Sequence, residues 1–242
     1  MTNKQKFFIR RAHRFLGVFI GIQFLLWTVS GLYFSWANHD TVVSKPYKKD
    51  AAAFAPNVAL ASPTAAIDSL KKQEKLDSLA TIRLIEIGGR PVYQIQFFAV
   101  GKRKTRLADA STATLREPLS KNEAVALAQS RFSESAQVAD IQYLTKETDN
   151  EEYRDDPLPA YAVTFAHPNS VTIFVSAEHG TIEKYRNDTW RIYDLLWMAH
   201  TMDYRETENI NNWLLRVFSV FSLVTVLSGF TLFFVSAKWR KK

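Results

Sequence analysis

Histidine is the residue type in this chain best suited to hold a metal-containing cofactor. Three of the five histidines lie close to long apolar segments: His13, His39 and His200. A neutral imidazole can bind haem iron, and a pair of imidazoles does so from opposite faces of the macrocycle, usually from facing helices. The sequence therefore marks these three residues as candidate haem ligands, with no other metal site expected. The alternative for each is a polar side chain that lies at a membrane surface without a cofactor.

The spacing of these histidines along the chain limits which of them can share one haem. His13 precedes an apolar run over residues 15–36, and His39 follows it. A helix through that run separates its two ends by about 30 Å, because each residue rises about 1.5 Å. We expect His200 near the same end of the run as His39, so these two could share a haem. His13 would need an imidazole from a second copy or another subunit.

Other catalytic chemistries find little support in the sequence. The chain has no cysteine, which excludes disulfides, thiolate nucleophiles and sulfur-ligated metals. Residues 147–156 hold six acidic side chains, but their spacing matches no calcium loop, so a solvated loop is the favoured interpretation. No Ser-His-Asp arrangement, Gly-rich phosphate loop or His-Glu-x-x-His motif is recognisable. We predict at most a redox role in electron transfer, and we expect His167 and His179 to be surface residues at strand turns.

Two apolar runs are long enough to cross a membrane. Residues 15–36 include no charge, and residues 213–236 include only Arg216. About 20 helical residues span the hydrocarbon core, so each run predicts a transmembrane helix. A signal peptide is the alternative for the first run. That run is too long and too aromatic for one, and Ser35 with Ala37 would make a poor cleavage site.

Positive charge is concentrated at the two ends of the chain. The net charge is +7, yet the segment between the apolar runs carries 21 basic and all 24 acidic residues, a balance of −3. Basic residues flank the cytoplasmic ends of membrane helices. The basic tails 1–14 and 237–242 therefore predict an inner-membrane protein in the lipid bilayer, with both termini cytoplasmic and the middle segment periplasmic. This distribution argues against a nucleic-acid partner.

Small and polar residues inside the two runs suggest close helix contacts. Gly17 and Gly21 form a small-x-x-x-small face on the first run, and Ser228 with Gly229 forms a thin spot on the second. Packing of the two helices on each other explains this pattern, and so does homodimerisation. Gln23 lies deep in the first run, where a hydrogen bond between helices is favoured over a cofactor contact.

The middle segment shows helix signals followed by alternating strands, twice. Residues 37–61 form an extended lead-in. Ser62 with Pro63 opens a helix to about residue 73, and Ser120 with Glu123 forms a capping box that opens a second helix to about residue 132. We predict strands at residues 79–87, 91–100, 104–110, 138–144, 160–166, 171–177 and 181–185. The recurrence predicts an α+β fold built by internal duplication, with repeats at residues 62–118 and 119–187.

A further amphipathic helix follows the repeats. Trp190, Tyr193, Trp197 and Met198 recur at roughly three- and four-residue spacings. We assign residues 188–210 to a juxtamembrane segment that lies against the domain base or the bilayer interface.

Several short stretches resemble the PepSY-associated transmembrane family. They are His13-Arg14-Phe15-Leu16-Gly17, Trp27-Thr28-Val29-Ser30-Gly31-Leu32, Met198-Ala199-His200-Thr201 and Leu227-Ser228-Gly229-Phe230. The resemblance implies two transmembrane helices that flank a periplasmic domain of two PepSY-like helix-plus-antiparallel-sheet repeats. Some larger relatives, with four or more spans, are haem-containing inner-membrane reductases linked to iron or siderophore uptake. PepSY domains elsewhere are thought to inhibit or regulate envelope proteins.

Two functions are consistent with this sequence. The first is a component that binds haem b and passes electrons outward to support iron or siderophore reduction. It would act as a homodimer or with a partner membrane subunit. The second is a PepSY binding or regulatory module, without a cofactor, that docks an envelope partner protein.

The topology can be tested directly. Because basic residues flank both runs at the same side, reporter fusions at Ala110 and after Lys242 should report opposite sides of the membrane. Paired alkaline phosphatase and green fluorescent protein fusions measure this. The same side for both positions would contradict the predicted topology.

Overall fold

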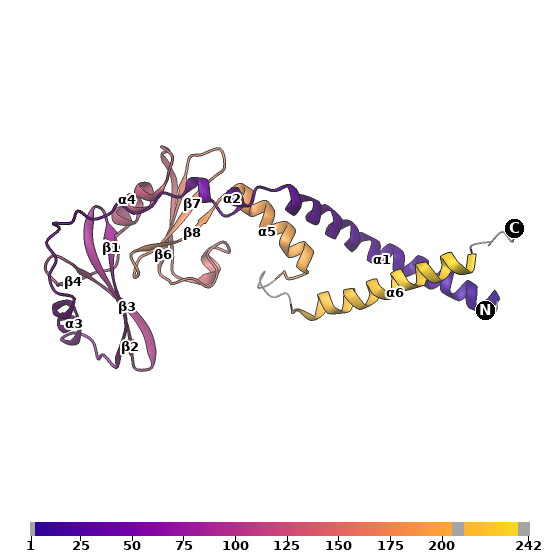
Figure 1. The fold of residues 1–242 in the computed structure, drawn as a ribbon, viewed down its shortest axis with the longest axis horizontal. Helices are drawn as coiled ribbons and strands as arrows, with labels where there is room; N and C mark the ends of the chain where they lie inside the picture. Colours follow the sequence, from indigo (N-terminus) through magenta and orange to yellow (C-terminus); the bar gives the residue numbers. More distant parts are fainter. Residues whose placement is uncertain (1–2, 205–210, 237–242) are drawn as a thin grey trace. The chain divides into compact units, whose positions relative to one another are not determined.

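The computed structural model describes residues 3–204 and 211–236, and the chain divides into two compact units. The helical unit comprises the described parts of residues 1–38 and 191–242. The sheet unit comprises residues 39–190. Figure 1 shows the helices and strands of both.

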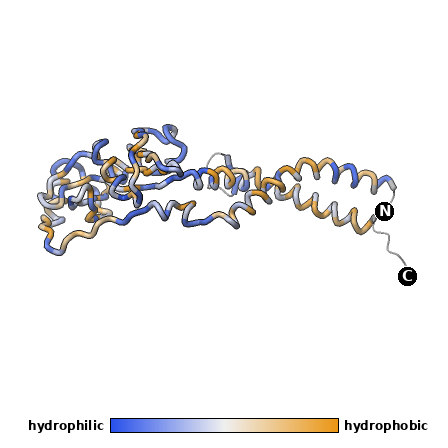
Figure 2. The backbone as a smooth tube through the Cα atoms, turned by 90° about the horizontal axis from the view of Figure 1, so that it is seen from above, coloured by the Kyte–Doolittle hydropathy of each residue, from blue (hydrophilic) through white to orange (hydrophobic). Residues whose placement is uncertain are grey.

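The helical unit contains two long apolar helices. They are α1, Asn3–Trp36, and α6, Trp213–Ser236. Residues Phe7–Trp36 and Trp213–Val235 are long and apolar enough to cross a membrane, and only 17% and 11% of their most apolar stretches are buried. Figure 2 shows hydrophobic residues along α6 and along α1 after its basic first turns. A core helix would bury such side chains, so lipid is the natural surrounding for them.

Helix α1 begins earlier than predicted. The basic segment 3–14 continues the transmembrane helix instead of forming a separate tail, because it contains no proline or glycine that would interrupt it. The predicted basic tail at residues 237–242 lies outside the described residues.

The lead-in to the sheet unit is not extended throughout. It starts with α2, His39–Val42, and a 3₁₀ turn η1, Lys45–Tyr47. The Asn187 side-chain amide holds this segment by donating to the carbonyl of Thr41 at 2.9 Å and to the hydroxyl of Ser44 at 2.6 Å. The segment that follows carries an isolated bridge between Lys48 and Phe132.

The first half of the sheet unit is one helix followed by one antiparallel sheet. Its elements are α3, Pro63–Lys71; β1, Ser78–Ile87; β2, Arg90–Ala99; β3, Lys102–Asp109; and β4, Leu115–Arg116. The strands lie in the order β1-β2-β3-β4. Ser62 caps the helix as predicted, by accepting a hydrogen bond from the Thr64 amide. The two-residue strand β4 was not predicted.

The second half repeats this order. Its elements are α4, Lys121–Arg131; β5, Val138–Leu144; the 3₁₀ turn η2, Glu147–Asp149; β6, Ala160–Phe165; β7, Thr172–Ser176; and β8, Thr181–Arg186. The strands lie in the order β5-β6-β7-β8, and both bonds of the predicted Ser120–Glu123 capping box are present. The fold is therefore α+β with two antiparallel sheets. Its origin by duplication stays a prediction.

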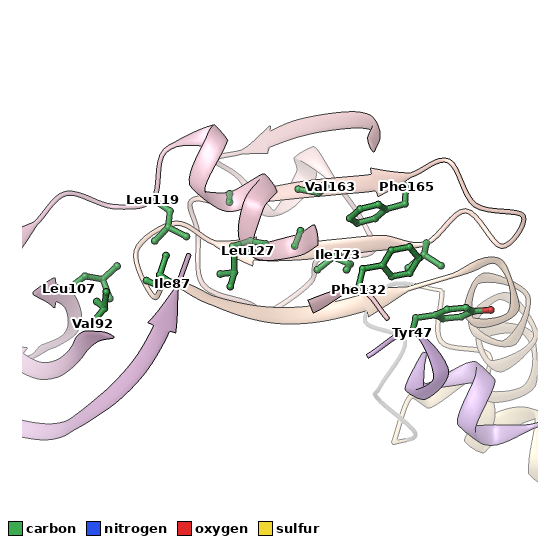
Figure 3. Close-up of a cluster of buried hydrophobic side chains, with 14 residues drawn as sticks. Tyr47, Ile87, Val92, Leu107, Leu119, Leu127, Phe132, Val163, Phe165 and Ile173 are labelled. Carbon is green, nitrogen blue, oxygen red and sulfur yellow. The ribbon is translucent and has the colours of Figure 1, made fainter. Parts of the chain in front are cut away.

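Each half has a hydrophobic cluster of its own, and a further cluster joins the two halves. Ile87, Val92 and Leu107 from the first half belong to the same buried cluster as Leu127 and Ile173 from the second. Figure 3 shows these side chains meeting between the halves. Neither half encloses this cluster without the other.

Gly180 lies where the halves meet. Its φ is +66°, a conformation that side chains disfavour. A Cβ atom there would lie 2.7 Å from Ile87 Cδ1 and 3.1 Å from Leu107 Cδ1, both across the junction. A side chain at this position would therefore have to displace the ends of the Ile87 and Leu107 side chains.

A pair of alanine substitutions separates backbone strain from this contact. Gly101 has a similar φ of +69° but open space around its Cα. We expect Gly101→Ala to cost about 1–2 kcal/mol, the penalty for left-handed backbone. Gly180→Ala should cost about 1–3 kcal/mol more, because it also overpacks the core. Thermal unfolding of the full chain measures both, and equal losses would contradict a tight junction at Gly180.

Candidate functional site

Helix α5 spans Asp188–Thr201, and its residues from Arg191 onward lie along α1 in the helical unit. The rings of Tyr193 and Phe34 lie 4.7 Å apart, and the Gln23 side chain contacts the Ala199 carbonyl at 3.0 Å. The two helices therefore run antiparallel. Gln23 precedes Trp36 by 13 residues, which is about 20 Å along the helix.

This position bears on the predicted juxtamembrane placement, which stays a prediction. The end of α5 lies at a level inside the predicted span 15–36 and not at its boundary. The helix stops at Thr201, where Met202 adopts a left-handed backbone with φ 55°. The predicted continuation over residues 205–210 lies outside the described residues.

Side chains satisfy the carbonyls at the end of α5. The side chains of Gln23, Trp27 and Asn212 donate to the carbonyls of residues 199–201, in that order, at 3.0, 2.7 and 2.9 Å. The last carbonyls of a helix have no partner within it, and lipid supplies none. Gln23 thus makes the hydrogen bond between helices that was predicted, whereas the roles of Trp27 and Asn212 were not foreseen.

The imidazole of His200 is held by a serine of α1. His200 Nδ1 lies 2.7 Å from Ser30 Oγ, and Ser30 Oγ lies 2.7 Å from the Leu26 carbonyl. The second contact joins two oxygens, so the hydroxyl hydrogen lies between them. The hydrogen between Ser30 and His200 must then come from Nδ1. This leaves a lone pair on His200 Nε2.

Aromatic rings surround this imidazole. Phe34 lies 5.7 Å and Trp27 lies 6.3 Å from the His200 ring, and Trp197 lies 5.9 Å from Phe34. Ser30 itself is fully buried. The serine–histidine pair therefore lies among aromatic side chains of α1 and α5.

His13 repeats this arrangement near the other end of α1. Its Nδ1 lies 2.7 Å from Ser228 Oγ of α6, and Ser228 donates to the Thr225 carbonyl at 2.7 Å. The same reasoning places a proton on Nδ1 and a lone pair on Nε2. A Cβ atom at Gly229 would lie 3.2 Å from His13 Cε1, so glycine gives the ring room against α6.

The two membrane-level histidines lie far apart in one chain. His200 contacts Ser30, which follows His13 by 17 residues, or about 25 Å along α1. They cannot bind one haem together. His39 is the first residue of α2 in the sheet unit, so its pairing with His200 stays a prediction.

The remaining candidates are tied into the sheet unit. His167 Nε2 contacts Glu134 Oε2 at 2.8 Å, and His179 Nδ1 lies 3.6 Å from Glu183 Oε1. Both are partly buried, which differs from the plain surface residues predicted. In the acidic loop, amides of residues 145–146 donate to Asp149 and lower the pKa of its carboxyl. Across the described ranges, no three acidic or histidine side chains gather in a group that could hold a metal ion.

The predicted glycine face on α1 is open. A Cβ atom at Gly17 or Gly21 would meet nothing within 4 Å, whereas Gly229 packs against His13. Contact between α1 and α6 therefore explains Gly229 but not Gly17 or Gly21. Homodimerisation through this face stays a prediction.

A family model described as PepSY-associated TM region matches residues 1–236. The chain belongs to this family. Family membership confirms the resemblance and establishes a membrane-associated PepSY protein, which agrees with the two apolar helices.

Other comparisons add little to the PepSY assignment. No curated protein matches the chain. Among solved structures, the crystal structure of a BLIP-like protein from Bacteroides fragilis NCTC 9343 is similar at 23% identity. The alignment covers 54% of this chain and 89% of that chain, with a TM-score of 0.21.

The serine contacts predict a specific tautomer for each histidine in this PepSY protein. ¹⁵N-histidine-labelled protein in lipid should show His200 and His13 protonated on Nδ1. Ser30→Ala should release only His200 into a mixture of tautomers, and Ser228→Ala should release only His13. Solid-state NMR of the imidazole nitrogens measures this. Protonation on Nε2 in the unmodified protein would contradict the assignment.

Proposed function

We propose that this PepSY membrane protein binds haem b through His200 and His13 and carries electrons across the membrane to support iron or siderophore reduction. The observation that supports it is the state of the two imidazoles. Each keeps a lone pair on Nε2 while Nδ1 is held by a serine.

The residues present fit such a cofactor. Iron binds neutral imidazole through a nitrogen lone pair, and a hydrogen bond at the other nitrogen fixes ring orientation and raises basicity. Ser30 and Ser228 supply these hydrogen bonds. Haem bound there would supply a one-electron carrier at each level.

Each level in one chain offers a single membrane-embedded histidine. A second imidazole to hold a haem would come from His39, or from a second copy or a partner subunit. The open face at Gly17 and Gly21 suits a homodimer, because small residues let helices approach closely. The levels of His13 and His200 lie about 25 Å apart along α1, a separation that suits electron transfer across a bilayer of about 30 Å.

The orientation follows from charge. Basic residues on the first turns of α1 favour a cytoplasmic N-terminus, and α6 returns the chain to the same side. The sheet unit then lies in the periplasm of an inner-membrane protein. In that orientation the His200 level is the outer one, close to where an extracytoplasmic acceptor would bind.

Absorption spectra test the proposal. Protein purified from haem-supplemented cells should show a Soret band and, on reduction, the sharp α and β bands of bis-histidine iron. His200→Ala should remove the haem at its own level and leave that of His13, roughly halving the haem content, and His13→Ala should do the converse. His167→Ala is the matched control and should change nothing.

A colourless product would refute haem binding, provided that the same cells load other haem proteins normally. The PepSY binding or regulatory module would then be the remaining function. Haem retained in full by the His200→Ala/His13→Ala double variant would refute the assigned ligands.

A further inference from the structure

A cleft in the sheet unit opens between the edges of the two sheets. Its volume is about 440 Å³. It is lined by residues 84–86 of β1, by residues 180–182 with Tyr185 at β8, by Leu127 and Arg131 of α4, and by the segment around residues 48–54. These elements all belong to one compact unit.

One side of the cleft is an edge strand with outward-facing backbone. Strand β1 is the first strand of its sheet and pairs with β2 alone. The Glu86 carbonyl accepts a hydrogen bond from Arg131 Nη2 at 3.4 Å, so it points away from β2. Backbone direction alternates along a strand, so the N–H and C=O of Leu84 point outward as well. A strand edge of this kind is a template for another extended chain.

The floor and the rim of the cleft differ in character. Leu127 is buried in the floor with half-buried Ile85 and Ile182 beside it. At the rim, Lys48 and Lys49 outnumber the single carboxylate of Asp50. The Glu86 charge is already neutralised, because its carboxylate pairs with Arg131 at 2.7 Å. The cleft therefore suits an apolar side chain next to a negative one.

The end of α4 fixes the shape of this cleft. The Arg131 carbonyl accepts from the Lys49 amide at 2.9 Å and from the Tyr185 hydroxyl at 3.1 Å. Burial raises the pKa of Tyr185 to about 12, so the hydroxyl keeps its proton. The segment around residues 48–54, α4 and β8 are thereby joined before any ligand binds, which lowers the conformational-entropy cost of binding.

We infer that this cleft binds an extended peptide segment of a partner protein, which adds a strand to β1 and carries an apolar side chain flanked by carboxylates. The peptide backbone forms hydrogen bonds with the main chain of Leu84. Its apolar side chain packs on Leu127 in the floor of the cleft, and a carboxylate beside it pairs with Lys48 and Lys49. This inference goes beyond haem binding and does not depend on it.

Fluorescence anisotropy with the full chain in detergent tests this inference. The probe is a fluorescein-labelled, capped peptide of sequence Asp-Val-Ile-Val-Asp. We expect saturable binding that a proline at the central position of the peptide abolishes, because proline removes a donor that strand pairing needs. A peptide with lysine at both ends should bind at least about tenfold more weakly, since it meets like charge at the rim.

Paired variants locate the binding. Leu84→Pro should weaken the peptide about tenfold while the β1–β2 ladder survives, because only an outward N–H is lost. Leu84→Ala keeps that N–H and should stay within about threefold of the original affinity. Lys49→Glu should also weaken binding about tenfold, and Lys121→Glu, at the opposite end of α4, should leave it unchanged.

Circular dichroism checks that each variant is folded. If Leu84→Pro does not fold, the result with Lys49→Glu alone decides the test. Absence of binding at millimolar peptide would overturn the inference. Binding that ignores both Lys49→Glu and Leu84→Pro would also overturn it. Dimers that form without peptide and exclude it would instead assign the cleft to a second copy.

Discussion

The need to satisfy every polar group inside a lipid bilayer shapes the helical unit more than any other constraint. Helix α5 ends beside the predicted span, where lipid would offer its last carbonyls no hydrogen-bond partner. Gln23, Trp27 and Asn212 supply the missing donors. The same contacts bring His200 to Ser30, so one requirement of the backbone also sets the position of an imidazole. The proposed haem site therefore depends on the contacts that complete the end of α5.

The sheet unit meets a different requirement. Its apolar sheet faces must be covered, and only some of its strand edges can stay exposed. The halves cover each other through the cluster that includes Ile87, Leu107 and Leu127, and Gly180 permits the approach. This arrangement leaves β1 at an edge beside a cleft whose floor is apolar. Stability of the unit and access to its binding edge therefore come from the same junction.

Short-range signals predicted most of the elements, whereas the candidate site depends on long-range partners. The capping box at Ser120 and the helix cap at Ser62 are decided by neighbouring residues, so the sequence revealed them. Neither Ser30 nor Ser228 was predicted to contact an imidazole, and Ser228 was assigned only to close helix packing, because a serine in a membrane helix usually bonds its own backbone. Both do so here, and each also accepts from an imidazole brought by another helix. No sequence pattern along one helix predicts the contact between such a serine and an imidazole of another helix.

The shared core also has a consequence for the order in which the chain is made. Synthesis runs from the N-terminus, so β1 to β4 leave the ribosome before α4 and β5 to β8 exist. Ile87, Val92 and Leu107 then remain uncovered until residues 163–175 follow. During that interval the nascent chain exposes apolar surface. A chaperone that binds unfolded chains would protect this surface during that time. Premature termination after the first half would yield a product with an unfinished interior, which quality-control proteases would recognise.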